Sequence, residues 1–205
     1  MTKEEQVNQR YIYIMLSRTH TIPARLIRLF TGATYSHTSL ALDVELKEMY
    51  SFARRRVHNP FNAGFVDEDI ETGIFGRDKN VYCSVYALAV TEEQYKVLCE
   101  ELKHFIRHRE LYDYNYKGLV GVLFGKNVAR DYNYFCSQFV SYILSRSGIE
   151  LFEKEHGLVQ PCDFHLQLEK QRIYEGKLTE YRKFVETMQM HIEQSDSLIA
   201  ATTSV

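Results

Sequence analysis

Short apolar runs along the chain predict several β-strands. Residues 11–16 (YIYIML) are apolar on both sides, which is typical of a strand in the middle of a sheet. Residues 80–90 alternate between apolar and polar side chains and contain enough β-branched residues to predict another strand. Residues 36–43 and 48–54 are two more β-like runs, and the tetrapeptide VELK between them predicts that they form a hairpin.

Other segments repeat their apolar residues with the period of an α-helix. From Tyr95 to Ile106 these residues follow the i, i+3, i+4, i+7 spacing of one buried face, and Thr91 and Gln94 form a capping-box pattern in front of them. Residues 112–124, aromatic and then apolar, predict a short helix or an irregular aromatic segment. Further elements are predicted as helices from Pro23 to Gly32, from Cys136 to a stop at Ser147–Gly148, from Pro161 to about Gln171 and over 181–193, and as a strand near Ile173 and Tyr174.

Residues 55–79 show neither period. They contain three glycines, the dipeptide Asn59–Pro60 and an acidic stretch, which together predict a long loop or lid. The phenylalanines of this segment could line an apolar groove for an acyl chain or a peptide, or could instead fill the core; they are Phe61, Phe65 and Phe75. Residues 195–205 are predicted to form a disordered tail. Residues 1–194 are expected to form a single α+β domain, with a small antiparallel sheet or half-barrel packed against helices.

The charge balance argues against several classes of partner. Lysine and arginine number 25 against 27 aspartate and glutamate residues, so the net charge of -2 offers no general attraction to nucleic acid or to anionic lipid. The N-terminus is polar and the apolar run after it is too short for a signal peptide or a membrane span, which predicts a cytoplasmic protein with no integral membrane segment. Because the chain has no glycine-rich phosphate loop, zinc signature or EF-hand spacing, no cofactor and no metal are predicted.

The cysteines lie far apart, without a CxxC pair, and are expected to be free thiols. Cys136 differs from Cys83, Cys99 and Cys162 because it opens a predicted helix, where the first-turn N–H groups and the helix dipole favour a thiolate. The other three are assigned structural roles. Cys136 can also be read as an inert core thiol, since it lies on the same helical face as Phe139.

A nucleophilic cysteine needs a base, usually histidine, and a third polar group that orients the imidazole. Among the eight histidines, His37 is the candidate base, because it begins a predicted hairpin strand that would fix the direction of its ring. A histidine on a strand can also serve a purely structural role. The run Arg54–Arg56 could hold a substrate carboxylate or phosphate, or could form a solvated face.

Both candidate residues belong to one pattern. Ser36–His37 at the head of a hairpin, followed much later by Phe135–Val140 (FCSQFV) at the start of a helix, resembles the circularly permuted papain-like hydrolases of the NlpC superfamily. These are the YiiX/YaeF-like proteins and their lecithin:retinol acyltransferase-like relatives, in which the histidine precedes the cysteine, as it does here. The resemblance spans roughly residues 10–175 and includes Pro161–Phe164, which is similar to the segment after the cysteine helix in the YiiX-like group. It implies a permuted papain-like domain.

The resemblance also implies a role for each site residue. Cys136 corresponds to the family nucleophile and His37 to its base. The third family member is a polar residue on the strand after the histidine strand, and Ser51 takes that position if the hairpin turns at VELK. Glu48 is the alternative if the register shifts, because a one-residue shift moves every side chain to the other face. Ser51 could equally be an ordinary strand serine.

The implied activity is acyl transfer, either by a thiol hydrolase of the amidase or peptidase kind or by an acyltransferase. The Cys136 thiolate attacks an amide, peptide or ester carbonyl, the backbone N–H of Cys136 helps to stabilise the oxyanion, and His37 protonates the leaving group. The expected partner is a peptide, amide or lipid-like substrate. Two non-catalytic alternatives are a peptide- or lipid-binding module that keeps the papain-like groove, and an interaction protein that docks through the helix over 181–193.

Overall fold

The structure, a computed structural model, describes residues 9–18, 34–56 and 59–203 of the 205-residue chain. The helix predicted from Pro23 to Gly32 lies outside these residues. The strands are β1 (Gln9–Arg18), β2 (His37–Ala41), β3 (Met49–Arg56), β4 (Asn59–Glu68), β5 (Tyr82–Thr91), β6 (Asp113–Tyr114), β7 (Asn133–Tyr134) and β8 (Arg172–Lys177). The helices are α2 (Gly73–Arg77), α3 (Glu92–Arg107), α4 (Tyr116–Leu123), α5 (Cys136–Arg146), α6 (Pro161–Gln167) and α7 (Leu178–Thr203).

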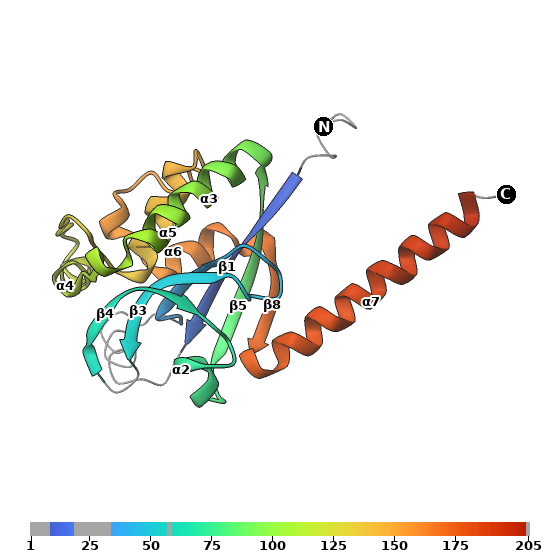
Figure 1. Ribbon diagram of the computed structural model, residues 1–205, viewed down its shortest axis with the longest axis horizontal. Coiled ribbons are helices and arrows are strands. Elements are labelled where there is room, and N and C mark those ends of the chain that lie inside the picture. Colours follow the sequence, from blue (N-terminus) through green and yellow to red (C-terminus); the bar gives the residue numbers. More distant parts are fainter. Residues whose placement is uncertain (1–8, 19–33, 57–58, 204–205) are drawn as a thin grey trace.

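The described strands form one eight-stranded sheet in the order β7-β6-β4-β3-β2-β1-β5-β8 (Figure 1). Neighbouring strands are antiparallel except β6 and β7, which run parallel, so the sheet is mixed. The α+β class predicted from the sequence is confirmed. The sheet is larger than the small antiparallel one that was expected.

The predicted hairpin is present, and its connection is fixed by a carboxylate. β2 and β3 pair at Leu40↔Tyr50 and Ala41↔Met49. Between them, the Asp43 carboxylate accepts a hydrogen bond of 2.7 Å from the Glu48 backbone N–H. A short polar side chain that bonds to its own backbone stabilises a tight connection in this way.

The local signals for two helices are also confirmed. At the start of α3, the Gln94 N–H donates to Thr91 Oγ1 at 3.1 Å and the Thr91 N–H donates to Gln94 Oε1 at 3.0 Å, which is the capping box. Helix α5 ends before Ser147, and Gly148 has a φ of 72°, the left-handed conformation that glycine adopts most easily. Helix α6 begins at Pro161 as predicted but ends earlier, at Gln167.

The prediction of a long loop or lid over residues 55–79 is wrong. β3 continues to Arg56, β4 pairs with it along most of its length, and α2 follows. The glycine, proline and asparagine of this stretch indicated a loop, although proline is tolerated at the start of a strand or at a bulge, and glycine where another backbone approaches closely. Gly64 lies so close to the Tyr112 carbonyl oxygen and the Arg55 side chain that an added Cβ atom would collide with both. The glycine here permits close strand packing instead of a turn.

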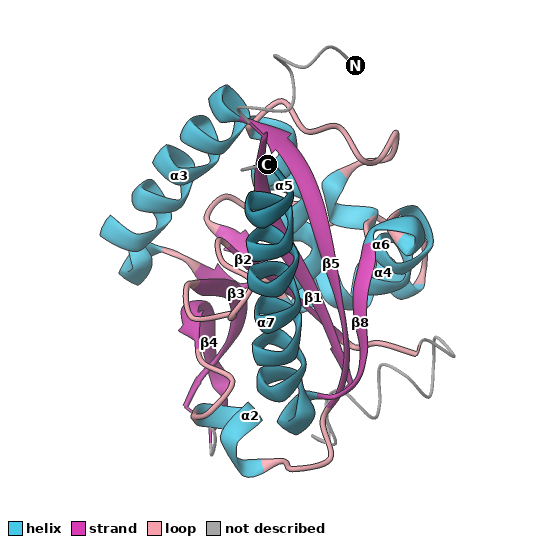
Figure 2. Ribbon diagram, turned by 90° about the vertical axis from the view of Figure 1, so that its right-hand side faces the viewer, coloured by secondary structure: helices cyan, strands magenta, loops and turns pink. Residues whose placement is uncertain are grey.

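Helices cover both faces of the sheet (Figure 2). α3 and α5 cover one face, over a core that includes Ile14, Leu40, Phe52 and Phe65. α2 and the first turns of α7 cover the other face, over Met15, Met49, Phe75 and Val85. Phe65 and Phe75 therefore fill the core, and the Phe61 side chain lies outside the described part of the structure.

Helix α7 projects away from the sheet (Figure 1). Its first turns are anchored by Tyr181, which is buried and donates from its hydroxyl to the Val44 carbonyl oxygen at 2.7 Å. The helix predicted over 181–193 is confirmed and extends farther in both directions. Because it continues to Thr203, residues 195–203 of the segment predicted to be a disordered tail are helical. None of the helices in the described part of the chain has the length and apolar character that a membrane span requires.

Candidate active site

A short pair of parallel strands positions Cys136. β6 and β7 pair with Tyr114 opposite Tyr134, so the chain leaves both strands at the same edge of the sheet. Phe135 is extended and precedes α5, of which Cys136 is the first residue. The next side chain fixes this end of the helix, since the Ser137 hydroxyl donates to the Val159 carbonyl oxygen at 2.7 Å. Cys136 thus lies where free N–H groups and the helix dipole stabilise a negative charge.

His37 begins β2 and meets a carboxylate from β4. Alternate residues of a strand share a face, so His37 and Ser39 point to the same side of the sheet. His37 Nε2 lies 2.9 Å from Glu68 Oε1 and 3.2 Å from Oε2, and the Ser39 hydroxyl donates to Glu68 Oε2 at 2.5 Å. Glu68, the last residue of β4, therefore holds the imidazole in one orientation.

His37 and Cys136 lie close enough for each to shift the pKa of the other. Because Nε2 contacts Glu68, Nδ1 is the ring nitrogen left for the thiol. Burial alone would raise the pKa of Cys136, but the hydrogen bond to His37, the charge of His37 and the backbone N–H groups of Thr38 and Ser137 together lower it. β2 pairs with β3 only at Leu40 and Ala41. Thr38 lies before these pairs, so β3 does not occupy its N–H, which is available to the sulfur.

The three groups stabilise one another in their charged forms. Burial alone would lower the pKa of His37, whose side chain is 15% exposed, but Glu68 and Cys136 outweigh this effect and hold that pKa well above its usual value. Burial would likewise raise the pKa of Glu68, yet the positive charge of His37 and the hydrogen bonds from His37 and Ser39 lower it. The row thus favours a thiolate, an imidazolium and a carboxylate.

Tyr114 is a further polar side chain at the thiol. It ends β6, and it lies close enough to Cys136 for the thiol to affect its pKa. Burial raises the pKa of Tyr114 well above its usual value, and the neighbouring thiolate raises it further. A phenol that stays protonated can donate a hydrogen bond to a negatively charged atom beside the sulfur.

Buried hydroxyl groups surround His37. Ser17 lies opposite it on β1, Ser36 and Thr38 flank it in the chain, and Ser51 lies on β3. Within the described residues, none of these four hydroxyl oxygens has a hydrogen-bond partner. The Ser51 hydroxyl is nevertheless close enough to Glu68 to help lower the pKa of that carboxyl group. The surroundings of the imidazole are therefore rich in groups that can bond to polar atoms of a substrate.

The site is closely covered. The Phe75 ring of α2 lies over His37, with 6.4 Å between the ring centroids. Only 3% of Cys136 is exposed. A substrate must therefore move side chains at the thiol before it can react there.

The structure places Cys136 near His37 and places neither candidate for the third residue against the imidazole. Ser51 lies beside Glu68, and it is Glu68 that contacts His37 Nε2. Glu48 is exposed in the connection before β3, where its backbone N–H bonds to Asp43. The carboxylate that orients the ring comes from a strand that the sequence analysis did not predict.

The other three cysteines have the properties expected of structural thiols. Burial raises the pKa of Cys83 to about 12. Burial also raises the pKa values of Cys99 and Cys162. Cys136 is thus the cysteine whose pKa is lowered.

The arginine run contributes to the framework. Arg55 donates to the backbone carbonyl oxygens of Arg109 and Tyr112, and to the Asp113 carboxylate at 3.2 Å. These contacts hold the start of β6 beside β4. Arg55 therefore helps to position the strand that ends at Tyr114.

Fold and site together define an α+β protein with a covered row of cysteine, histidine and glutamate side chains. Within the described residues, no three histidine, cysteine, aspartate or glutamate side chains converge closely enough to hold a metal ion. Comparisons with protein-family models, with curated proteins and with solved structures found no match. The membership in the NlpC superfamily that the sequence motifs imply stays a prediction.

Proposed function

We propose that this protein is a cysteine-dependent hydrolase or acyltransferase that acts on an amide, peptide or ester carbonyl through a thioacyl-enzyme. The observation that carries the proposal is the row Cys136–His37–Glu68, in which a lowered thiol pKa, a raised imidazole pKa and an orienting carboxylate coincide. The order of the histidine and cysteine motifs supports a permuted papain-like arrangement. Nothing in the row depends on a cofactor.

In the proposed first step, the Cys136 thiolate forms a bond to the carbonyl carbon and a tetrahedral oxyanion develops. The backbone N–H of Cys136, at the start of α5, and the Tyr114 hydroxyl are the donors assigned to that oxygen. The proton on His37 Nδ1 passes to the leaving nitrogen or oxygen as its bond to carbon breaks. Glu68 keeps the ring in position and stabilises its positive charge until that transfer.

In the proposed second step, water or an acceptor amine or alcohol attacks the thioester. Neutral His37 takes the proton of the attacking group, and the carbon–sulfur bond breaks to regenerate the Cys136 thiolate. Hydrolysis and acyl transfer differ only in the acceptor. The hydroxyl group of Ser17, which is buried opposite the base on β1, is suited to hold either one.

The test is to trap the acyl group. The protein is mixed with p-nitrophenyl esters of short and long acyl chains, quenched in acid, and examined by intact-protein and peptide mass spectrometry. We expect one acyl group on Cys136, lost in Cys136→Ala and retained in Cys99→Ala, the matched control. Acylation of all four cysteines at similar rates, or of none, would contradict the proposal.

A second candidate is a non-catalytic module that binds peptide or lipid-like ligands. The 3% exposure of Cys136 favours it, because a nucleophile needs an open path to its substrate. The rate of alkylation by iodoacetamide near neutral pH separates the two. Faster modification of Cys136 than of the more exposed Cys99 supports catalysis, and slower modification supports the binding module.

A further inference from the structure

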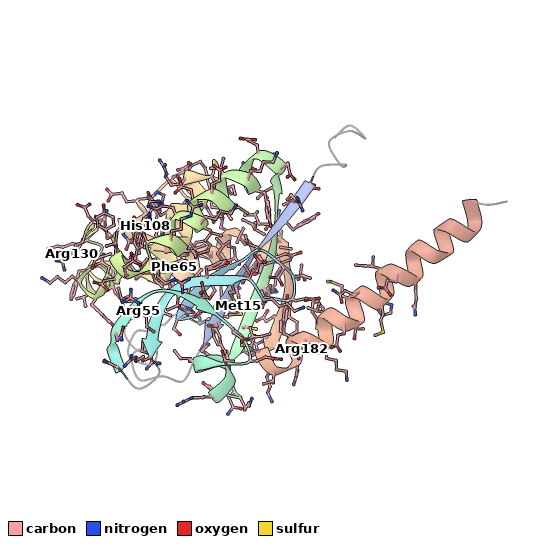
Figure 3. All side chains as sticks on the ribbon, in the orientation of Figure 1. Met15, Arg55, Phe65, His108, Arg130 and Arg182 are labelled. Atoms are coloured by element: carbon pink, nitrogen blue, oxygen red, sulfur yellow. The ribbon has the colours of Figure 1, made fainter. Side chains whose placement is uncertain are left out.

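A cavity of about 550 Å³ lies between α3, α5 and the turn that precedes β7. Figure 3 labels His108 and Arg130, which adjoin this region, at the end of the molecule opposite α7. None of Cys136, His37, Glu68 or Tyr114 lines it. It is therefore a separate site, and its ligand does not depend on the function proposed above.

Aromatic rings form much of its wall. Tyr112 and Tyr132 have ring centroids 5.7 Å apart at an interplanar angle of 60°. Tyr134 and Tyr142 have centroids 5.3 Å apart at 46°. Tyr112 and Tyr134 join the two pairs, at 6.3 Å and 50°. Rings inclined in this way pack edge to face against one another while lining the cavity, and each ring face carries the negative side of the ring quadrupole.

Carboxylates add negative charge at the same cavity. Glu100, Glu101 and Asp131 line it. Glu101 is bonded to Arg146, with Nη2 to Oε1 at 3.1 Å. Glu100 and Asp131 have no ion-pair partner among the residues that the structure describes. Asp131 is close enough to Tyr134 to contribute to the raised pKa of that phenol, for which burial is the first cause.

The basic side chains on the wall do not offset this charge. Arg146 is already neutralised by Glu101. The other is His104, whose ring lies against His108 with centroids 4.8 Å apart. Apart from the histidine, the lining contains three carboxylates and one guanidinium, so negative groups outnumber positive groups by two.

Tyr132 supports a binding role independently. It is 55% exposed and has a φ of 59°, a left-handed conformation that a bulky side chain rarely adopts. Glycine or asparagine would fit this turn with less strain. A strained and exposed tyrosine at the rim of an aromatic cavity is consistent with a ring that contacts a ligand.

We propose that this cavity binds an organic ammonium group, such as the headgroup of a quaternary amine. Tyrosine faces attract a soft cation that carries methyl groups, and the unpaired carboxylates Glu100 and Asp131 supply the long-range attraction. An anionic ligand would meet the same carboxylates and is disfavoured. A purely apolar ligand would gain contact with the rings but nothing from the charge.

The test compares choline with 3,3-dimethylbutanol, its neutral carbon isostere, by isothermal titration calorimetry of the full chain. Low salt preserves the attraction. We expect choline to bind at least about tenfold more tightly than the isostere. Equal affinities, or no binding of choline, would overturn the proposal.

Variants locate the binding. Tyr132→Leu and Glu100→Gln each change an exposed side chain and are expected to weaken choline binding by about fivefold. The matched controls are Tyr11→Leu, an exposed tyrosine of β1, and Glu93→Gln, an exposed carboxylate at the start of α3. Neither control should change the affinity. If the controls weaken binding as much as the cavity variants do, choline binds elsewhere and the assignment is wrong.

Discussion

Replacing Glu68 by glutamine tests the row of charges directly. In Glu68→Gln the side chain keeps its length and can still accept a hydrogen bond from His37 Nε2, now 2.9 Å from Oε1. The variant removes the negative charge and replaces Oε2, which accepts from Ser39, by an amide NH2 that donates. The Glu68 side chain is 10% exposed, so solvent screens this charge poorly and its loss should be felt by the imidazole.

The size of the effect follows from the geometry. An imidazolium and a carboxylate whose charge centres lie about 4 Å apart attract each other by about 4 kcal/mol at an effective dielectric constant of about 20. Loss of this attraction would lower the pKa of His37, because the imidazolium loses that stabilisation. The hydrogen bond that glutamine keeps returns about 1 kcal/mol, which leaves a loss of about 3 kcal/mol. The pKa of Cys136 then rises, because the neutral ring no longer stabilises the thiolate.

The assay is the rate of Cys136 alkylation by iodoacetamide between about pH 5 and pH 9, read by peptide mass spectrometry. In the wild type, the rate should reach half its maximum below the pH at which an ordinary thiol does, and in Glu68→Gln this midpoint should move upward. Histidine proton resonances followed by NMR give the pKa of His37 independently. The matched control is Ser51→Ala, which removes the hydroxyl beside Glu68 without touching His37 Nε2.

Two results would refute the reasoning. The first is an unchanged midpoint in Glu68→Gln together with native circular dichroism, which would mean that the carboxylate does not stabilise the imidazolium. The second is a larger shift in Ser51→Ala than in Glu68→Gln. That outcome would return the orienting role to Ser51, the residue that the sequence predicted.

Three further predictions concern the oxyanion, the pH dependence and the sheet. Tyr114→Phe should lower the acylation rate of Cys136 by about tenfold to a hundredfold while its alkylation rate changes little, as measured with p-nitrophenyl esters and iodoacetamide on the same preparation. The pKa of Glu68 is lower in the folded protein, so its charge stabilises the fold at neutral pH and this stabilisation is lost as the pH falls through that pKa. Urea unfolding should therefore show that the difference in unfolding free energy between wild type and Glu68→Gln becomes smaller below about pH 4. Gly64→Ala should lower the unfolding free energy by about 1–3 kcal/mol, since the added Cβ meets the Tyr112 carbonyl oxygen. Its control is Gly73→Ala, where no atom lies near the added Cβ. That variant should lose stability only because its φ of 59° is unfavourable for alanine.

Much of the fold follows from local patterns. The strands β1, β2, β3 and β5, the capping box of α3 and the glycine stop of α5 each depend on residues within a few positions of one another. Cys136 and His37 could be found for the same reason. One opens a helix and the other begins a strand, and both features are visible in the sequence.

Strand β4 could not be predicted from its own residues. Gly64, Pro60 and Asn59 are typical of loops, and the acidic residues after them are typical of a solvated turn. What stabilises the strand lies elsewhere, in its pairing with β3 and in the Arg55 contacts that bring β6 to its other side. A strand of this kind is specified by its neighbours more than by its composition.

The same cause explains why Glu68 was missed and Ser51 was chosen. A hairpin suggests that the residue beside His37 comes from the next strand, and Ser51 is indeed on the correct face. However, a serine hydroxyl reaches only across one strand, whereas a glutamate side chain two strands away can pass over Ser51 to Ser39 and His37. In the structure β4 pairs with β3 so that Val66 lies opposite Ser51. If the sequence had revealed this register, the alternation of side chains along a strand would have placed Glu68 on the same face as His37. In this sheet, the length and charge of a side chain therefore decide which residue orients the base, and distance along the chain is a poor guide to it.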